Sequence, residues 1–334
     1  MVHPVTVPPR RDTARLLFAT ARALADSGVV ADDFLKPVRP HVPAHVLDAL
    51  RPHLDLPDRQ TGVRTIPGLL DDFTGLEPTP ERWGLPQAGL TRTLDVALTI
   101  VAFALGEPFA WAGQQAGRLV HDIVPTQGLE DKQVGASSLT ALEWHTEDSF
   151  HPERAQVLML YCVRNPDGVG SRVSSIRGTG LSGERLDLLR RPEVVILPDD
   201  SYPSTWREDG ADGRPADAVR TVWDADDGPC VRYDPPYSRF LTADPAFHDA
   251  YRELGDALER NSVTVGVGTG DILLIDNDLA VHGRAPFRPR YDGTDRWLKR
   301  LQLRLPRARP ASEDRESGYG QRPLRVGAPA DPPA

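Results

Sequence analysis

The chain has 334 residues, of which 40% are hydrophobic and 26% charged, a composition typical of a soluble globular protein. It contains no run of eighteen apolar residues, so we expect no membrane-spanning helix. A formal net charge of −9 argues against a nucleic-acid surface, because phosphate binding needs concentrated positive charge.

The N-terminal third of the chain is predicted to be helical. Its first residues, MVHPVTVPPRRDTAR, lack the apolar core of a secretory signal. Cys162 and Cys230 are too few for a disulfide framework, which together with the missing signal favours a cytoplasmic protein. Apolar residues at helical spacing then predict helices at 12–28, 43–54 and 91–106.

Beyond residue 156 the pattern changes to short runs of β-branched and apolar residues. Such runs at irregular spacing, with turn residues between them, predict an antiparallel sandwich or barrel inside a helical wrapper. The predicted strands are 157–163, 171–176, 193–198, 229–233, 262–267, 271–275 and 296–305, interrupted by predicted helices at 182–191 and 244–261.

Two segments differ from this pattern. Residues 201–220 are polar, rich in Gly and Pro, and lie between strands, so they form either a lid over a site or an ordinary surface loop. Residues 306–334 have the composition of a disordered tail. We therefore expect one domain over 1–305, mostly helical over about 1–110 and mainly β over 111–305.

Three histidine-x-acid triplets are candidates for metal binding: 53–55, 145–147 and 151–153. In an extended segment residues i and i+2 point to the same side, so His145 and Glu147 can reach one ion. The proline in 151–153 disfavours a regular strand, and 53–55 lies in a helical pattern where i and i+2 diverge. The sequence favours the triplet at 145–147, and a polar loop without metal is the alternative.

A third ligand is suggested much later in the chain. The apolar strand at 271–275 runs into an Asp/Asn turn and then a short apolar segment that reaches His282. Two hairpin strands could bring His282 opposite His145 and Glu147. A lone histidine in such a position is more often a hydrogen-bonded structural residue.

The strand at 296–305 adds a second indication. Its period of two places Arg296, Leu298, Arg300, Gln302 and Arg304 on one face and a mostly apolar set on the other. Buried arginines need anionic partners, because an unpaired buried charge is very costly. The alternative is a surface strand whose arginines lie in water.

Two histidines and one carboxylate form the facial triad typical of non-haem Fe(II) oxygenases. A zinc hydrolase with the same ligands is an alternative, and so is a non-catalytic jelly-roll that binds a small acid through its arginines. An arginine beyond the metal favours iron with a 2-oxo acid, since the distal carboxylate of that acid needs a forked, charged partner. Arg296 follows His282 by fourteen residues and suits this role.

Several segments together resemble the clavaminate synthase-like branch of the Fe(II)/2-oxoglutarate-dependent oxygenases (TauD-type superfamily). The most similar members are the bacterial hydroxylases of arginine and asparagine. The segments are GQQAGRLVHDIVP, LEWHTEDSFHPERAQVLMLYCVRNPDGVGS and DNDLAVHGRAPFRPRYDGTDRW, with the spacing of Arg296 and Arg300. The resemblance implies a mainly β fold, a distorted double-stranded β-helix (jelly-roll, cupin-like) with helices packed outside.

The resemblance also implies roles for individual residues. It assigns His145, Glu147 and His282 to Fe(II), Arg296 to the C5 carboxylate of the cosubstrate 2-oxoglutarate, and Ser171 or a near neighbour to the same cosubstrate. It assigns Gln114, Glu147 and Arg300 to the backbone groups of an amino-acid substrate, and Asp199, Ser201 and Asp234 to the substrate side chain.

One departure concerns the substrate. The arginine hydroxylases tend to carry a second acid two residues beyond the equivalent of Asp234, where this chain has Pro236. A lysine, citrulline or asparagine side chain is therefore an alternative to arginine, and Asp199 could instead cap a turn.

The activity that the resemblance implies is O2-dependent hydroxylation of an unactivated C–H, at Cβ or Cγ, of an L-α-amino acid. Arginine or another basic or polar amino acid is expected, free or tethered to a carrier protein, in the biosynthesis of a natural product such as an antibiotic. Desaturation or cyclisation by the same centre is the alternative within this class. The sequence does not indicate an oligomeric state.

Overall fold

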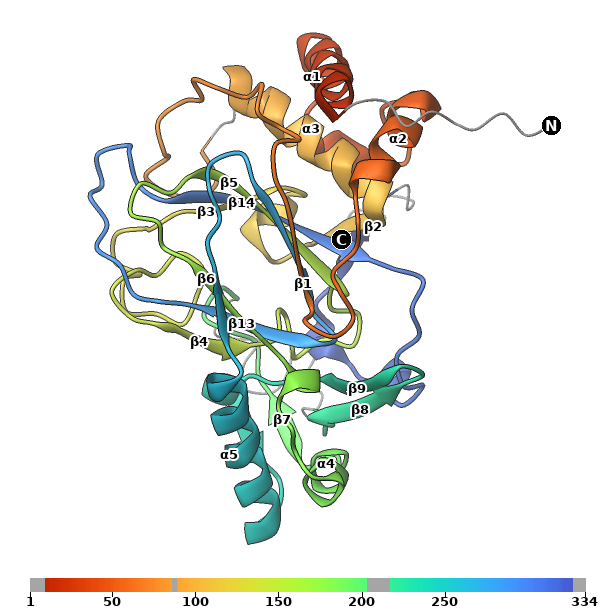
Figure 1. Ribbon diagram of the computed structural model, residues 1–334, viewed down its shortest axis with the longest axis vertical. Helices are drawn as coiled ribbons and strands as arrows, with labels where there is room; N and C mark the ends of the chain where they lie inside the picture. Colours follow the sequence, from red (N-terminus) through yellow and green to blue (C-terminus); the bar gives the residue numbers. More distant parts are fainter. Residues whose placement is uncertain (1–9, 86–88, 203–216, 327–334) are drawn as a thin grey trace, which may run out of the picture.

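Two antiparallel sheets lie in the middle of the molecule, with helices at both ends (Figure 1). The computed structural model describes residues 10–85, 89–202 and 217–326. The larger sheet has the strand order β1-β12-β5-β14-β2-β15, with β3 also paired to β14, and the smaller one has the order β11-β6-β13-β4. Two-stranded ribbons, β10-β7 and β8-β9, complete the described strands.

The helices are α1 (Arg10–Asp26), α2 (Ala44–Leu50), α3 (Gly89–Leu105), α4 (Gly183–Leu189) and α5 (Pro245–Arg260). The strands are β1 (Val63–Ile66), β2 (Glu107–Trp111), β3 (His121–Ile123), β4 (Leu142–His145), β5 (Val157–Arg164), β6 (Ser171–Ser175), β7 (Val194–Ile196), β8 (Val222–Ala225), β9 (Gly228–Val231), β10 (Ser238–Phe240), β11 (Val263–Val265), β12 (Ile272–Asp276), β13 (Ala280–Arg284), β14 (Trp297–Arg304) and β15 (Pro323–Arg325).

Strand β5 shows why the larger sheet is apolar on both faces. Successive side chains of a strand point to opposite sides, so a strand between two layers must be apolar throughout. Val157, Met159, Tyr161 and Val163 belong to the core cluster shared with α1, α2 and α3, whereas Leu158, Leu160 and Cys162 belong to the cluster between the sheets. The predicted helical wrapper therefore covers the outer face of this sheet.

The side chains of strand β14 alternate between its two faces as predicted. Trp297, Leu301 and Leu303 join the core under the N-terminal helices. Lys299 lies on that same face and is fully buried. Its Nζ is 2.9 Å from Asp95 Oδ1 on α3 and 2.7 Å from Asp122 Oδ1 on β3. This buried ion pair ties the helical layer to the sheet.

The predicted helices are all present, and each predicted strand has a counterpart among β5, β6, β7, β9, β11, β12 and β14. The short apolar segment at His282 is β13, which follows β12 through the expected turn. The prediction omitted β1, β2, β3, β8, β10 and β15. These strands have three to five residues and little apolar periodicity of their own. β8 pairs with the adjacent β9, and the others become regular only through pairing with strands distant in the chain.

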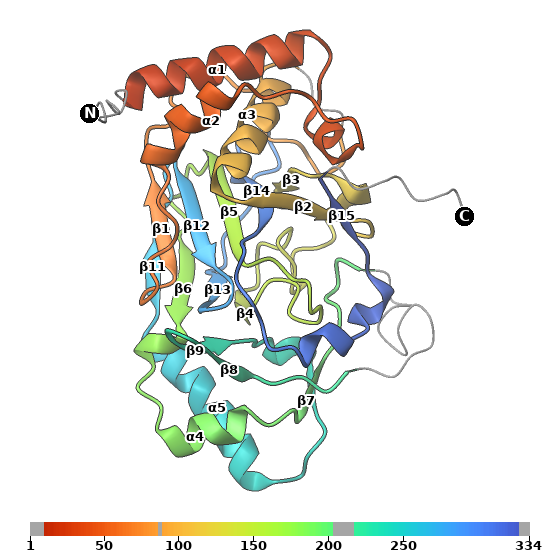
Figure 2. The same ribbon diagram turned by 90° about the vertical axis from the view of Figure 1, so that its right-hand side faces the viewer.

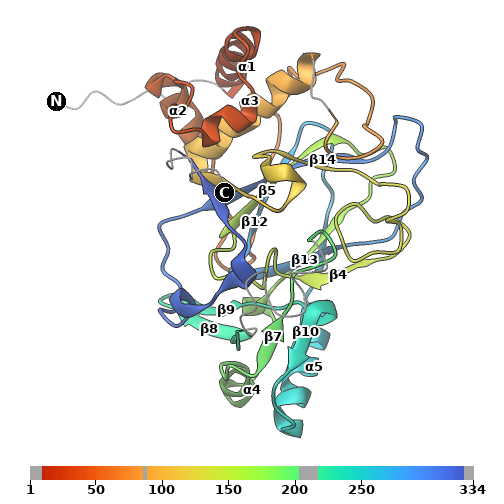
Figure 3. The same ribbon diagram turned by 180° about the vertical axis from the view of Figure 1, so that it is seen from behind.

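The prediction that the chain after residue 305 forms a disordered tail is wrong up to residue 326. Figures 2 and 3 show this segment returning along one side of the molecule, where β15 pairs antiparallel with β2. Its charged residues have buried partners that composition cannot reveal. Arg309 Nη2 lies 2.7 Å from Asp278 Oδ1, and Glu313 Oε2 lies 2.8 Å from Nη1 of the fully buried Arg154.

The proposed lid at 201–220 falls largely on residues 203–216, outside the described ranges. Its two flanks are described: Tyr202 is buried, and Val219 bridges to Val194 on β7. Within the described ranges, no helix is both long and apolar enough to cross a membrane.

The buried Lys299 generates a stability prediction. Replacing it in Lys299→Met removes the ammonium buried between Asp95 and Asp122 and leaves Arg118 as their remaining cation, 3.8 Å from Asp95 and 3.0 Å from Asp122. This loss should lower the free energy of unfolding by about 3 kcal/mol in urea denaturation. Arg22→Ala is the control, because it removes an exposed helical ion pair with Asp26 and should cost under about 1 kcal/mol. Equal losses in the two variants would contradict this account.

Candidate metal centre and substrate pocket

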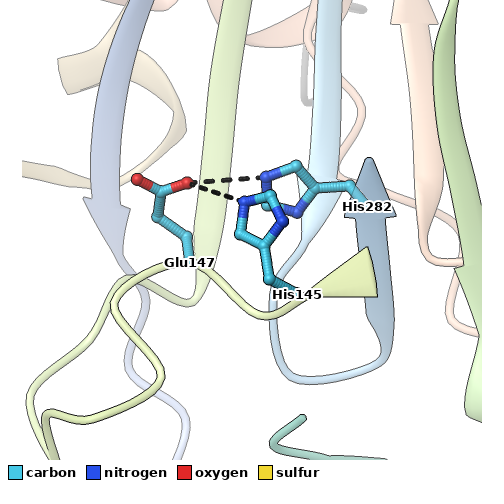
Figure 4. A group of neighbouring side chains, drawn as sticks. All are labelled: His145, Glu147 and His282. Atoms are coloured by element: carbon cyan, nitrogen blue, oxygen red, sulfur yellow. Dashed lines mark ion pairs between the residues drawn. The ribbon is translucent and has the colours of Figure 1, made fainter. Parts of the chain in front are cut away.

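His145 and His282 face each other across two neighbouring strands. His145 is the last residue of β4, and His282 is its register partner in the middle of β13. Their ring centroids are 4.1 Å apart (Figure 4). The β4–β13 pairing thus brings together two residues far apart in the chain.

Glu147 completes the group from the turn that follows β4. Its Oε2 atom lies 3.8 Å from His145 Nε2 and 3.4 Å from His282 Nε2. One ligand atom from each of the three side chains falls within 4.8 Å of the others, as Figure 4 shows. The hydrogen bond from His145 Nδ1 to the Glu143 carbonyl, 2.9 Å long, orients the ring so that Nε2 faces Glu147. Two imidazoles and a carboxylate on one side fit a divalent metal with open positions.

The charge on this group is set by burial and by close neighbours. Burial alone would raise the pKa of Glu147, but the charge of Arg300 and the two imidazoles hold that pKa well below its usual range. Burial and the nearby His145 lower the pKa of His282 to about 4. Burial would also lower the pKa of His145, but the negative charge of the nearby Glu147 carboxylate outweighs it and raises the pKa to about 9. Metal binding would therefore displace a proton from His145.

Arg300 on β14 connects Glu147 to residues on other strands. Its Nη1 donates to Glu147 Oε1. Its Nη2 donates to Gln114 Oε1 at 2.9 Å and to His121 Nδ1 at 2.8 Å. Burial and the positive charge of Arg300 lower the pKa of His121 well below its usual value, so this imidazole is neutral and accepts the bond.

Arg296 differs from Arg300 in the contacts of its guanidinium group. Its side chain is 7% exposed, and it has no hydrogen bond or ion pair with any residue in the described ranges. It lines the pocket between the sheets with Ser171, Leu158 and Leu298. Burial lowers its pKa to about 10, so it still carries its charge at neutral pH. A buried, unpaired guanidinium in an apolar setting is suited to an anion that enters the pocket.

Two carboxylates, Asp199 and Asp234, line the same pocket and have no ion pair with any cationic side chain of the described residues. Burial raises the pKa of Asp234 to about 7 despite the opposing charge of His145, and Asp234 Oδ2 accepts only the Ser149 hydroxyl, at 2.9 Å. Burial also raises the pKa of Asp199. Asp199 Oδ1 accepts from the backbone N–H and the hydroxyl of Ser201, so its predicted turn-capping role is present as well.

The structure gathers most of the predicted site residues in one pocket between the sheets. Its lining includes His145, Glu147, Ser171, Asp199, Asp234, His282, Arg296 and Arg300. Gln114 and Ser201 line an adjoining pocket that shares Asp199 and Arg300 with the first. The triplets at 53–55 and 151–153 do not join the metal group. His151 instead is hydrogen bonded through Nε2 to the Gln321 carbonyl at 3.0 Å.

Sequence reasoning missed His121, Asp148 and Arg284 near the site. His121 was not recognised because the short β3, which sets it beside Arg300, was not predicted. Asp148 follows Glu147 directly and accepts from Trp111 Nε1, the Tyr202 hydroxyl and Gln302 Nε2, each at 2.7 Å. Arg284 lines the pocket and donates to backbone carbonyls at Ser137 and Thr140. Its position two residues after His282 was the available signal.

Comparison with known proteins supports this arrangement. The family described as "Taurine catabolism dioxygenase TauD, TfdA family" matches residues 102–302. An enduracididine beta-hydroxylase of Streptomyces hygroscopicus is 35% identical over 277 residues, which cover 77% of this chain and 80% of the relative. An L-ornithine/L-arginine 3-hydroxylase of Catenulispora acidiphila is 36% identical over 275 residues, covering 75% and 80%.

A solved structure provides a comparison of the fold. The non-heme iron oxygenase OrfP, in complex with Fe, succinate and (3S)-hydroxy-L-Arg, aligns with a TM-score of 0.72 and 34% identity. The alignment covers 88% of this chain and 92% of OrfP. The double-stranded β-helix expected from the sequence is thereby confirmed, and the zinc hydrolase and the non-catalytic binding protein lose their support. The chain belongs to the TauD, TfdA family of dioxygenases.

Proposed function

We propose that this chain is an Fe(II)/2-oxoglutarate-dependent hydroxylase of an L-α-amino acid with a basic or polar side chain, arginine first among the candidates. One observation carries the proposal. The His145/Glu147/His282 group opens into a pocket lined by two arginines, Arg300 on β14 and the buried Arg296 directly before that strand. Arg300 is already paired with Glu147, whereas Arg296 has no partner among the described residues.

The metal and the cosubstrate would occupy the part of the pocket between Glu147 and Arg296. His145, Glu147 and His282 would hold Fe(II), which with 2-oxoglutarate and O2 supplies the oxidant for C–H hydroxylation. Arg296 would pair with the C5 carboxylate of 2-oxoglutarate through two parallel hydrogen bonds. Ser171 lies on β6 at the same pocket wall and would add a hydroxyl to that carboxylate.

The backbone groups of the amino acid would bind at Arg300. The substrate α-carboxylate would share this guanidinium, while Gln114 and Glu147, both in contact with Arg300, would accept from the α-amino group. Clamping this end beside the metal ligands leaves the β or γ carbon nearest to the reacting position, and hydrogen abstraction follows proximity.

The substrate side chain would point toward Asp199 and Asp234. Asp234 is buried and Asp199 half-buried, and neither has a cationic partner within the described ranges, which favours a side chain with positive charge. Ser201 is bonded to Asp199 and would fix the direction of its carboxylate. Pro236 lines the pocket where a further acid would grip a guanidinium, so lysine, citrulline and asparagine remain substrates to test.

The metal assignment predicts a specific loss of binding. His282→Ala removes one of three ligands and should weaken Mn(II) binding, measured by calorimetry, by more than the roughly 10- to 100-fold that loss of an outer-shell partner costs. His53→Ala is the matched control, because it removes a histidine from the same kind of triplet outside the metal group and should leave the affinity unchanged. Unchanged Mn(II) affinity in His282→Ala would refute the assignment.

Arg296 and Arg304 allow a second test on one face of β14. Arg296→Ala should raise the KM for 2-oxoglutarate by about 30-fold or more, since truncating one partner of a buried charge pair costs at least about 2 kcal/mol. Arg304→Ala should leave that KM nearly unchanged, because Arg304 pairs with the half-exposed Glu153. The KM for the amino acid should change little in either variant.

The activity itself is tested with a panel of substrates. The protein is incubated with Fe(II), ascorbate and 2-oxoglutarate against the twenty amino acids, citrulline and ornithine, and each product mass is recorded. We expect succinate together with a product heavier by one oxygen atom. A product lighter by two hydrogens would indicate desaturation or cyclisation, and turnover only of carrier-bound amino acids would indicate a tethered substrate.

The carboxylate of Asp234 leads to a prediction about which substrates of that panel are affected by its removal. Asp234→Asn should reduce kcat/KM for arginine or lysine far more than for asparagine or citrulline, because only the cationic side chains lose an ion pair. Equal losses for charged and neutral substrates would show that Asp234 does not receive the side chain.

A further inference from the structure

The turn between β12 and β13 carries a fully buried asparagine, Asn277. Its Oδ1 accepts from the backbone N–H of Glu147 at 2.8 Å. Its Nδ2 donates to the backbone carbonyl of Glu147 at 3.1 Å and to that of Ala155 at 3.0 Å. The hydrogen-bonding capacity of this side chain is therefore directed at the backbone that bears one metal ligand and at the loop leading away from it.

Glu147 needs such a support because it lies outside the sheet. Strand β4 ends at His145, and the ladder between β4 and β13 pairs His145 with His282 but stops before Glu147. The side-chain amide of Asn277 presents one donor and one acceptor, as a peptide group of a neighbouring strand would. It thus extends the pairing to Glu147, two residues beyond the end of the strand.

The position of Asn277 links two ligands. It lies in the same hairpin as His282, five residues earlier, and the two strands of that hairpin are buried throughout. A rigid hairpin that carries His282 and is hydrogen bonded to the backbone of Glu147 fixes the separation between these two residues. The strand pairing already fixes His145 relative to His282, so Asn277 supplies the remaining constraint.

We infer that Asn277 is a positioning residue for the metal: it holds the backbone of Glu147 at a set distance from His282 so that the three ligands are in place before the ion arrives. This inference rests on the proposed metal centre. Without Asn277 the ligand set would have to be ordered on binding, and metal affinity would fall even though every ligand is still present.

The chain offers a matched control in Asn165. Its side chain makes the same set of bonds, accepting from Val169 N at 3.0 Å and donating to the carbonyls of Val169 and Val267 at 3.1 Å each. None of these partners is a metal ligand or adjoins one. Asn277→Ala and Asn165→Ala therefore remove equivalent hydrogen bonds and differ in what those bonds hold.

The experiment measures Mn(II) affinity by calorimetry and the urea midpoint of the metal-free full chain for both variants. We expect the urea midpoint to fall in both variants, with the larger decrease in Asn277→Ala because its bonds are fully buried whereas those of Asn165 are half-buried. We expect Mn(II) binding to weaken by about 10- to 100-fold in Asn277→Ala and by less than about twofold in Asn165→Ala. Equal Mn(II) affinities in the two variants would overturn the inference, because a merely structural role predicts that result.

Asn277→Ser guards against a folding failure. It introduces no buried charge and keeps a small polar side chain, but it is too short to bond both the N–H and the carbonyl of Glu147, so it should fold and still bind Mn(II) more weakly than the unmodified protein. If neither variant folds while Asn165→Ala does, Asn277 is a determinant of the whole fold and the inference is wrong. Absence of Mn(II) binding by the unmodified protein would instead overturn the proposed function.

Discussion

A carboxylate buried between two sheets is the constraint on which the site depends. Glu147 can remain ionised there only if neighbouring charges replace the water that it loses. Arg300 on β14, His145 on β4 and His282 on β13 supply that compensation. The same carboxylate lies beside both imidazoles and is hydrogen bonded to Arg300, so under the proposed function the metal end and the substrate end of the pocket share one buried charge.

Side chains point alternately to the two faces of strand β14, and its charged residues are therefore divided between these faces. On its outer face Lys299 forms ion pairs with Asp95 and Asp122, which join the helical layer to the sheet. On its inner face Arg300 is paired within the protein whereas Arg296 is not. Four residues of a strand span about 13 Å, so the two guanidinium groups can serve two different anions without competing for one. The proposed division of the two arginines between cosubstrate and substrate is based on this spacing.

The longer elements and the metal ligands could be predicted because their signals are local. Helical periodicity, the apolar runs of β5 and β12, and the i, i+2 spacing of His145 and Glu147 need only neighbouring residues. The short strand β3 and the segment after residue 305 could not be predicted in this way. β3 pairs with β14, and the charges of the C-terminal segment find buried partners such as Arg154, so distant residues stabilise both.

The sequence by itself determined the three ligands, the two arginines on one strand face and the resemblance that joins them, because side-chain chemistry and strand periodicity are local properties. Only the tertiary structure decided which charges are compensated. It showed that Arg296 is unpaired, that His121 and Gln114 hold Arg300, and that Asn277 grips Glu147. Burial and hydrogen bonding depend on residues brought together from distant parts of the chain, and no local pattern encodes them.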